Sequence, residues 1–231
     1  MYLEVIVFDL GGTLMEFKDM PHSWINYYYS AFLSMKNSLG LSISDNDIKK
    51  SCKILKEYNP RVSKRELEYS PIQIFTDVTS HWNAEIDIGT IIFEFFKGLD
   101  LSPVIFDDTI QCLQILRKSN YKLAVLTDLP TAMPDEMMKN NIKSIINEID
   151  LYVSSLSCGY RKPNPYGLKY IAEYYNITTD NLLFVGDEEK DIKTAQNANC
   201  KSVLIARNEN KNFGQNFTIV SLNELFSVLH R

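Results

Sequence analysis

Three aspartates, a lysine and a threonine lie just after short apolar runs of the sequence or close to them, and their side chains are of types that can act together in catalysis. Asp9 follows the apolar run VIVF, Thr127 follows KLAVL, Lys162 lies in GYRKPNP, and Asp187 and Asp191 follow LLFVG in GDEEKD. Carboxylates are ligands that Mg²⁺ accepts, together with waters and substrate phosphate. A lysine and a hydroxyl beside such an ion can bind the oxygens of a transferring phosphoryl group. These residue types therefore point to phosphoryl chemistry.

The apolar runs before these residues predict the elements that position them. Short β-branched and apolar runs that alternate with helical patterns predict βαβ units, a parallel sheet and helices on both of its faces. The carboxyl ends of parallel strands share one rim, so we expect the polar residues to meet there. The predicted strands are Val5–Phe8, Lys122–Leu126, Leu151–Val153, Leu182–Val185, Ser202–Ile205 and Phe217–Val220. The predicted helices are Asp107–Ser119, Pro165–Asn176, Glu189–Ala198 and Leu222–Leu229, and helical turns are expected at Thr131–Asn147.

The stretch between the first strand and the others has a different pattern. It carries helical periodicity with few strand signals, so we expect helices at Ser23–Leu39, Asp45–Tyr58, Lys64–His81 and Glu85–Lys97. The fold class is therefore α/β, with a Rossmann-like core formed by residues 1–14 and 105–231. Residues 15–104 are predicted to be an inserted all-α cap domain over the carboxyl ends of the strands.

The chemistry that such a rim supports follows from the groups themselves. Asp9 can attack phosphorus to give an aspartyl-phosphate, which splits one difficult step into two easier ones. Lys162 and Mg²⁺ would hold the charge on the phosphoryl oxygens, and Thr127 would donate a hydrogen bond to one of them. Backbone N–H groups of the loop Leu10–Thr13 can form an anion-binding nest. Asp191 can orient Lys162 or a metal-bound water.

Four motifs in order resemble those of the haloacid dehalogenase superfamily: FDLGGTL, LTD, RKPNP and VGDEEKDIKTAQNA. The helical insertion sits where the type-one cap of that superfamily sits. The resemblance implies a Rossmann-like core, magnesium dependence and an aspartyl intermediate. By position, Asp9 corresponds to the nucleophile and a metal ligand, and the backbone carbonyl of Gly11 to a second ligand. Asp187 corresponds to a further metal ligand, and Asp191 to a ligand or a residue that supports the ligands.

The same correspondence assigns the phosphoryl-binding residues. Thr127 and Lys162 match the family positions that hold the phosphoryl group, and Asp128 stands where Asn is often found. The residues that we expect to bind the phosphoryl group are Gly12, Thr13, Thr127, Asp128 and Lys162.

Gly11 is the main departure from the family pattern. Most phosphatases of the superfamily carry a second aspartate here, as general acid and then base, and such a group contributes about 10²–10⁴ in rate. Another group can take its place (Glu16, Asp19, Asp128, Glu188 or a cap residue), or the substrate can carry a good leaving group such as an acyl phosphate. Alternatively, the protein binds phosphate compounds and turns them over slowly or never.

Other branches of the superfamily also lack that aspartate. The 2-haloacid dehalogenases carry Tyr there and the phosphonatases Ala. Because the dehalogenases need no magnesium and the GDEEKD run is acidic, the sequence favours a magnesium-dependent hydrolase of a small phosphate ester. A weakly active or inactive phosphate-binding regulator, and a member that cleaves another kind of bond, are the alternatives.

Composition limits the partners. The 231 residues carry a net charge of −5, which argues against a general nucleic-acid or anionic-membrane binder. No apolar run reaches the roughly 18 residues of a membrane span, and the N-terminal stretch lacks the basic region of a secretory signal. Four cysteines form no CxxC pair. We expect a cytoplasmic monomer or homodimer whose partner is a small phosphorylated molecule.

Overall fold

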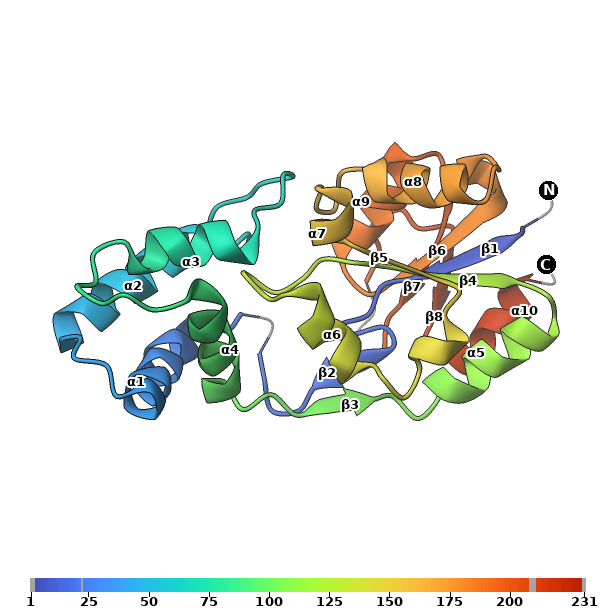
Figure 1. The fold of residues 1–231 in the computed structure, drawn as a ribbon. Coiled ribbons are helices and arrows are strands. Elements are labelled where there is room, and N and C mark those ends of the chain that lie inside the picture. Colours follow the sequence, from blue (N-terminus) through green and yellow to red (C-terminus); the bar gives the residue numbers. More distant parts are fainter. Residues whose placement is uncertain (1–2, 22, 208–210, 230–231) are drawn as a thin grey trace. The chain divides into compact units, whose positions relative to one another are not determined.

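The computed structural model describes residues 3–21, 23–207 and 211–229, which form two compact units (Figure 1). The sheet unit contains the described residues up to Glu16, Pro103–Asp128 and the described residues from Lys139 onward. The helical unit contains Phe17–Ser102 and Leu129–Met138. The sequence had assigned the last of these segments to the core. Thr131 in this segment hydrogen-bonds to Tyr28, which is one reason why the segment belongs with the helices.

A six-stranded parallel sheet forms the sheet unit and confirms the predicted Rossmann-like core. Its spatial order is β5-β4-β1-β6-β7-β8, so the first strand of the chain lies between two strands that come much later. The strands are β1 (Val5–Phe8), β4 (Lys122–Thr127), β5 (Leu151–Ser154), β6 (Leu182–Gly186), β7 (Lys201–Ile205) and β8 (Phe217–Ile219). Strands inside a parallel sheet are covered on both faces, which explains why β1 and β6 are apolar without alternation.

Helices cover both faces of this sheet (Figure 1). Alternate residues of β1, β4 and β6 form one core cluster with apolar residues of two helices on the same face, α8 (Tyr166–Tyr174) and α9 (Glu189–Asn197). The close approach of α8 depends on Gly167, where an added Cβ would stand 2.4 Å from Leu126 Cδ1. The helices of the C-terminal part and its connections are α5 (Thr109–Lys118), α6 (Asp135–Asn141), α7 (Ser155–Cys158), α8 (Tyr166–Tyr174), α9 (Glu189–Asn197) and α10 (Leu225–Leu229).

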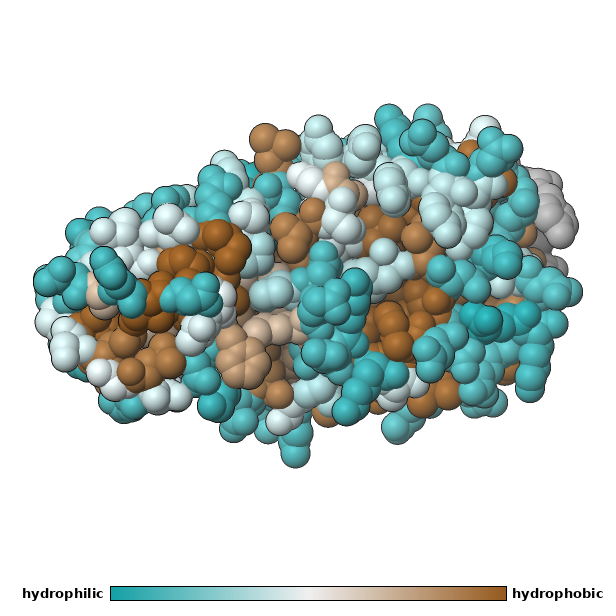
Figure 2. Space-filling model, in the orientation of Figure 1, coloured by the Kyte–Doolittle hydropathy of each residue, from teal (hydrophilic) through white to brown (hydrophobic). Residues whose placement is uncertain are grey.

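The helical unit is held together by aromatic packing. The ring of Phe32 lies 4.7 Å from that of Phe95 and 6.3 Å from that of Phe75, and all three side chains are fully buried. Figure 2 shows that the unit also presents apolar surface to solvent; Ile72 and Phe93 are among its exposed side chains. Its helices are α1 (Tyr28–Leu39), α2 (Asp45–Glu57), α3 (Pro71–Thr79) and α4 (Ile88–Gly98).

One predicted helix, Lys64–His81, is wrong in its first part. The helix α3 begins only at Pro71, because Ser70 accepts a hydrogen bond from the N–H of Gln73 and acts as its N-cap. Proline is favoured at this first helical position, since its missing N–H would have had no partner. The periodicity of residues 64–70 was therefore not helical.

Two short strands were also absent from the prediction. Strands β2 (Met15–Phe17) and β3 (Pro103–Ile105) pair with each other where the chain passes from one unit to the other. Each is three residues long, too short to give a pattern that the sequence reveals. No helix in the described residues is long and apolar enough to cross a membrane.

Arg207, just after β7, fixes the loop that follows β1. Its guanidinium donates two hydrogen bonds of 2.9 Å to the carboxylate of Asp108 and one of 2.9 Å to the carbonyl of Thr13. It also lies 4.0 Å from the ring centre of Phe106. Asp108 accepts further bonds from Ser221 Oγ and the N–H of Leu222. Burial would raise the pKa of Asp108, but Arg207 and these other donors hold it below its usual value.

We predict that Asp108→Asn lowers the free energy of unfolding by about 2 kcal/mol at pH 7, because it removes a charged acceptor from buried donors. Since the folded pKa of Asp108 is depressed, its contribution is complete above the unfolded pKa of about 4 and is lost as pH falls through the folded value. Urea denaturation between pH 3 and 8 checks this. The exposed neighbour provides a control, Asp107→Asn, and an equal effect of both variants at every pH would contradict the prediction.

Candidate active site

The ends of three central strands bring the predicted site residues to one rim. Asp9 follows β1 directly, and its N–H donates to the carbonyl of Val185 in β6. Phe8 is in register with Val125 on one side and Val185 on the other. Thr127 and Asp187 stand two residues beyond these partners. The strand register therefore places Asp9, Thr127 and Asp187 on adjacent strands at the same edge of the sheet.

Lys162 is the centre of a buried charge cluster. Its Nζ lies 2.7 Å from Asp9 Oδ1 and 2.6 Å from Asp191 Oδ1. The three side chains are 2%, 7% and 0% exposed, respectively. Asp187 completes the group: one carboxylate oxygen from each of Asp9, Asp187 and Asp191 lies within 4.8 Å of the others. Residues that the sequence singled out in three of the four motifs thus lie in one place.

The carboxylates in this cluster repel one another. Burial, opposed by Lys162 but reinforced by Asp191, raises the pKa of Asp9 to about 6. Burial together with Asp9 and Asp191 raises the pKa of Asp187 to about 8. Burial would lower the pKa of Lys162, but Asp191 and Asp9 raise it above its ordinary value. Three carboxylates around one ammonium are short of positive charge, which a divalent cation would supply.

Asp187 and Asp191 differ in their contacts within the protein. Asp187 Oδ1 is buried and has no hydrogen-bond partner in the described part of the chain. Asp191 Oδ1 likewise has no hydrogen-bond partner among the described residues, but it forms an ion pair with Lys162 Nζ at 2.6 Å, and Asp191 Oδ2 accepts the N–H of Glu188 at 2.9 Å. This second bond belongs to a capping box at the start of α9. The donor set of Asp9 and Asp187 fits Mg²⁺, whereas the position of Asp191 fits a residue that orients Lys162.

Asp128 holds the other end of Lys162. Its Oδ1 accepts the backbone N–H of Lys162 at 3.0 Å, and its Oδ2 lies 3.3 Å from Lys190 Nζ. Lys190 also lies 3.0 Å from Glu188 Oε2. Burial would raise the pKa of Asp128, but Lys190 and Lys162 hold it below its usual value.

Sequence reasoning missed Lys190. The signal for it was present: Asp128 adds a charge where the family often carries Asn, and a lysine occurs within the acidic GDEEKD run. An unusual charge in one motif predicts an opposite charge nearby, and the structure places the two in contact.

Gly11 and Gly12, in the loop after β1, differ in the space available for a side chain. Gly12 has a φ of +77°, and a Cβ there would lie 2.2 Å from Asp187 Oδ2. A side chain at position 12 would therefore displace Asp187. A Cβ on Gly11 would meet nothing within 4 Å. Position 11 consequently has room for the aspartate that the family usually carries.

The backbone N–H groups of this loop are engaged within it. The N–H of Gly12 donates to the carbonyl of Met15, and that of Thr13 donates to the carbonyl of Leu10. Thr13 Oγ1 is buried and lacks a hydrogen-bond partner among the described residues. Phosphoryl binding by Gly12 and Thr13, and metal binding by the Gly11 carbonyl, stay predictions.

The residues considered as replacements for the missing acid fall into two groups. Asp128 and Glu188 lie at the cluster, but both are ion-paired with Lys190. Glu16 and Asp19 are exposed, and Asp19 belongs to the helical unit. None of these four side chains lies in the group formed by Asp9, Asp187 and Asp191.

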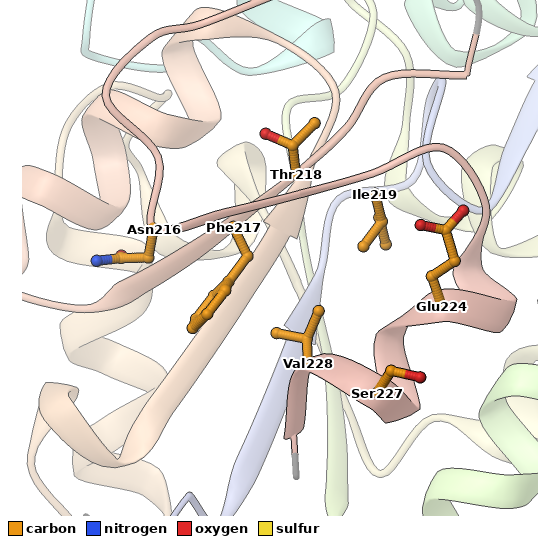
Figure 3. A pocket seen from close by; sticks show the side chains of 7 residues that line it. All are labelled: Asn216, Phe217, Thr218, Ile219, Glu224, Ser227 and Val228. Carbon is orange, nitrogen blue, oxygen red and sulfur yellow. The ribbon is translucent and has the colours of Figure 1, made fainter. Parts of the chain in front are cut away.

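A separate cavity of about 400 Å³ lies between β8 and α10 (Figure 3). Phe217, Ile219 and Val228 line it together with polar residues, among which Glu224 supplies the charge. A single carboxylate beside apolar side chains does not provide the paired groups that hydrolysis needs. The cluster around Lys162 is therefore the candidate active site.

Comparison with known proteins agrees with this geometry. The haloacid dehalogenase-like hydrolase family matches residues 3–199, so the chain belongs to that family of hydrolytic enzymes. A phosphoglycolate phosphatase of Colwellia psychrerythraea is 25% identical over 151 residues, which cover 63% of this chain and 66% of that protein. One from Aliivibrio fischeri is 26% identical over 102 residues, which cover 44% of each. The chain thus aligns with about half to two thirds of these relatives.

Solved structures show the same fold. The HAD phosphatase from Thermococcus onnurineus superposes with a TM-score of 0.65 and 18% identity, over 98% of this chain and 98% of that chain. At this identity the likeness concerns the fold alone. The family match, the parallel sheet and the order of the motifs together confirm the resemblance that the sequence indicated.

We predict that Mg²⁺ raises the melting temperature of the wild-type protein but not of Asp187→Asn. A ligand at 100 times its Kd stabilises by about 2.7 kcal/mol, which corresponds to about 5–10 °C for a chain of this size. Without Mg²⁺ the variant should melt higher than wild type at pH 7, because the raised folded pKa of Asp187 costs stability at every pH above its unfolded pKa of about 4, and the amide removes this cost. Thermal denaturation with and without MgCl₂ measures both effects.

A matched variant in the same acidic run is Glu189→Gln. Glu189 pairs with Lys193 on the surface of α9 and lies outside the carboxylate group. It should keep the full response to Mg²⁺. Equal responses of wild type and Asp187→Asn would remove Asp187 from the metal site.

Proposed function

We propose that this protein is a magnesium-dependent phosphatase that hydrolyses a small phosphate ester through an aspartyl-phosphate on Asp9. The observation that carries the proposal is the buried contact of Lys162 with Asp9 beside Asp187 and Asp191. A buried lysine next to a nucleophilic carboxylate binds phosphoryl oxygens, and the acidic group suits the cation that phosphoryl transfer uses. The names of the curated relatives, phosphoglycolate phosphatases, support the same class of substrate.

Asp9, Asp187 and the carbonyl of Gly11 would hold Mg²⁺, which supplies the charge that lets a phosphate approach a carboxylate. Asp191 holds the ammonium of Lys162 in place, so that it can bind phosphoryl oxygens during the reaction. Thr127, at the end of β4, donates its hydroxyl hydrogen to another of these oxygens.

The reaction takes place in two displacements at phosphorus. Asp9 forms a bond to phosphorus as the bond to the ester oxygen breaks, and the departing oxygen takes its proton from solvent because Gly11 offers none. Water then attacks the aspartyl-phosphate, which releases inorganic phosphate and regenerates the Asp9 carboxylate. Both steps lack a positioned acid or base at residue 11, so esters with good leaving groups, including acyl phosphates, are favoured.

Gly11 also favours a second candidate function. A protein that binds phosphate compounds through Lys162 and turns them over slowly would keep the charge cluster and dispense with the acid. The ion pairs of Asp128 and Glu188 with Lys190 are consistent with this alternative, because paired carboxylates are poor proton donors. A cytoplasmic location, a cap function of the helical unit and a monomeric or homodimeric state stay part of the proposal.

We predict that Asp9→Asn lowers magnesium-dependent hydrolysis of p-nitrophenyl phosphate and 2-phosphoglycolate by about 10³-fold or more, because the amide is no nucleophile. Phosphate release measured at saturating Mg²⁺ tests this. The matched control is Asp180→Asn on the exposed surface, which should keep wild-type turnover. Turnover by Asp9→Asn at the wild-type rate would end the proposal of an aspartyl intermediate.

Gly11→Asp should increase kcat for alkyl phosphates by about 10²–10⁴-fold, the usual contribution of a positioned acid and base. The gain should be smaller for p-nitrophenyl phosphate, whose leaving group needs little protonation. The open space around position 11 admits the side chain. Gly11→Asn, which has the same size but cannot transfer the proton, is the control. High native turnover of alkyl phosphates without a gain in Gly11→Asp would show that another acid is already in place.

A further inference from the structure

Lys190 closes a ring of charged contacts around the catalytic lysine. Asp128 binds the backbone N–H of Lys162, Lys190 bridges Asp128 and Glu188, and Glu188 caps the helix that carries Asp191. Asp191 in turn binds the Nζ of Lys162. The ring joins the segments that follow β4, β5 and β6.

We propose that Lys190 is a positioning and charge-compensating residue for the phosphoryl site, required because Asp128 is an aspartate. The inference rests on the proposed function, since it concerns the binding of a phosphoryl group beside Lys162. Lys190 acts through Asp128 and is not itself a ligand of the phosphoryl group.

The position of Asp128 explains why compensation is needed. Its side chain is 7% exposed, and it follows Thr127 directly while holding the backbone of Lys162. A neutral amide at this position can accept the same N–H without adding charge. The carboxylate adds a negative charge next to the place where a phosphate must bind, and like charges in a poorly solvated site repel strongly. Lys190 offsets this charge from the opposite oxygen of Asp128.

The position of Lys190 makes it suitable for this role. Its side chain is 32% exposed and contacts two carboxylates, so its own charge is engaged within the ring. The ion pair also ties Asp128 to the first turn of α9, whose capping box orients Asp191. Loss of Lys190 should therefore weaken phosphate binding through Asp128 and affect the chemical step less.

The test is a double-mutant cycle with inorganic phosphate as the probe, measured by calorimetry in the presence of Mg²⁺. Lys190→Met should raise the Kd for phosphate about tenfold, with a similar rise in KM and a smaller fall in kcat. Lys190→Arg should largely restore binding. Asp128→Asn/Lys190→Met should recover most of the affinity, because the charge that Lys190 offsets next to the phosphoryl site is removed together with Lys190.

A control variant and a second substitution at Lys190 separate a specific effect on phosphate binding from a loss of folded protein. Lys193→Met changes a lysine of the same helix that pairs with Glu189 on the surface, and it should bind phosphate as wild type does. Lys190→Gln repeats the test with a polar side chain if the methionine lowers the yield of folded protein.

Unchanged phosphate affinity in Lys190→Met and Lys190→Gln would overturn the inference, because Lys190 would then be an ordinary surface ion pair. It would also be overturned if the double variant bound phosphate as weakly as Lys190→Met, since Lys190 would then act independently of Asp128. Phosphate binding is measured without turnover. A response of binding to Lys190 in a protein that hydrolyses no ester would therefore refute the proposed function and leave the inference standing.

Discussion

The central physical constraint is an excess of buried negative charge. Asp9 and Asp191 pair with the buried ammonium of Lys162, and one carboxylate oxygen of Asp187 lies within 4.8 Å of an oxygen of each. Burial and the neighbouring carboxylates raise the pKa of Asp9 and of Asp187, so further positive charge beside them would favour their ionised forms. The three carboxylates of this group could together hold a metal ion.

Several features around the cluster hold its side chains and the neighbouring loop in place. The parallel register of β1, β4 and β6 places the carboxylates on one rim. The capping box of α9 aims Asp191 at Lys162. Arg207 holds the Thr13 carbonyl and so fixes the loop that carries the two glycines.

The sheet and the four site motifs could be predicted because their signals are local and strong. Apolar β-branched runs mark buried strands, and an aspartate directly after such a run has only one edge of the sheet to occupy. The start of α3 was misjudged because periodicity in residues 64–70 outweighed the Ser70–Pro71 boundary signal. The grouping of residues 129–138 with the helices was not predictable, since it depends on contacts far apart in sequence, such as Thr131 with Tyr28. The sequence also could not predict that Asp191 pairs with Lys162 and Glu188 while Asp187 Oδ1 has no partner among the described residues, because this depends on the orientation of each carboxylate.

The two glycines of the β1 loop have unequal evolutionary freedom. Gly12 is confined by Asp187 and by its left-handed backbone, whereas Gly11 borders empty space. A single base change converts a glycine codon into one for aspartate or glutamate, so a carboxylate at residue 11 is mutationally close and sterically admissible. The glycine now present is therefore not imposed by the architecture.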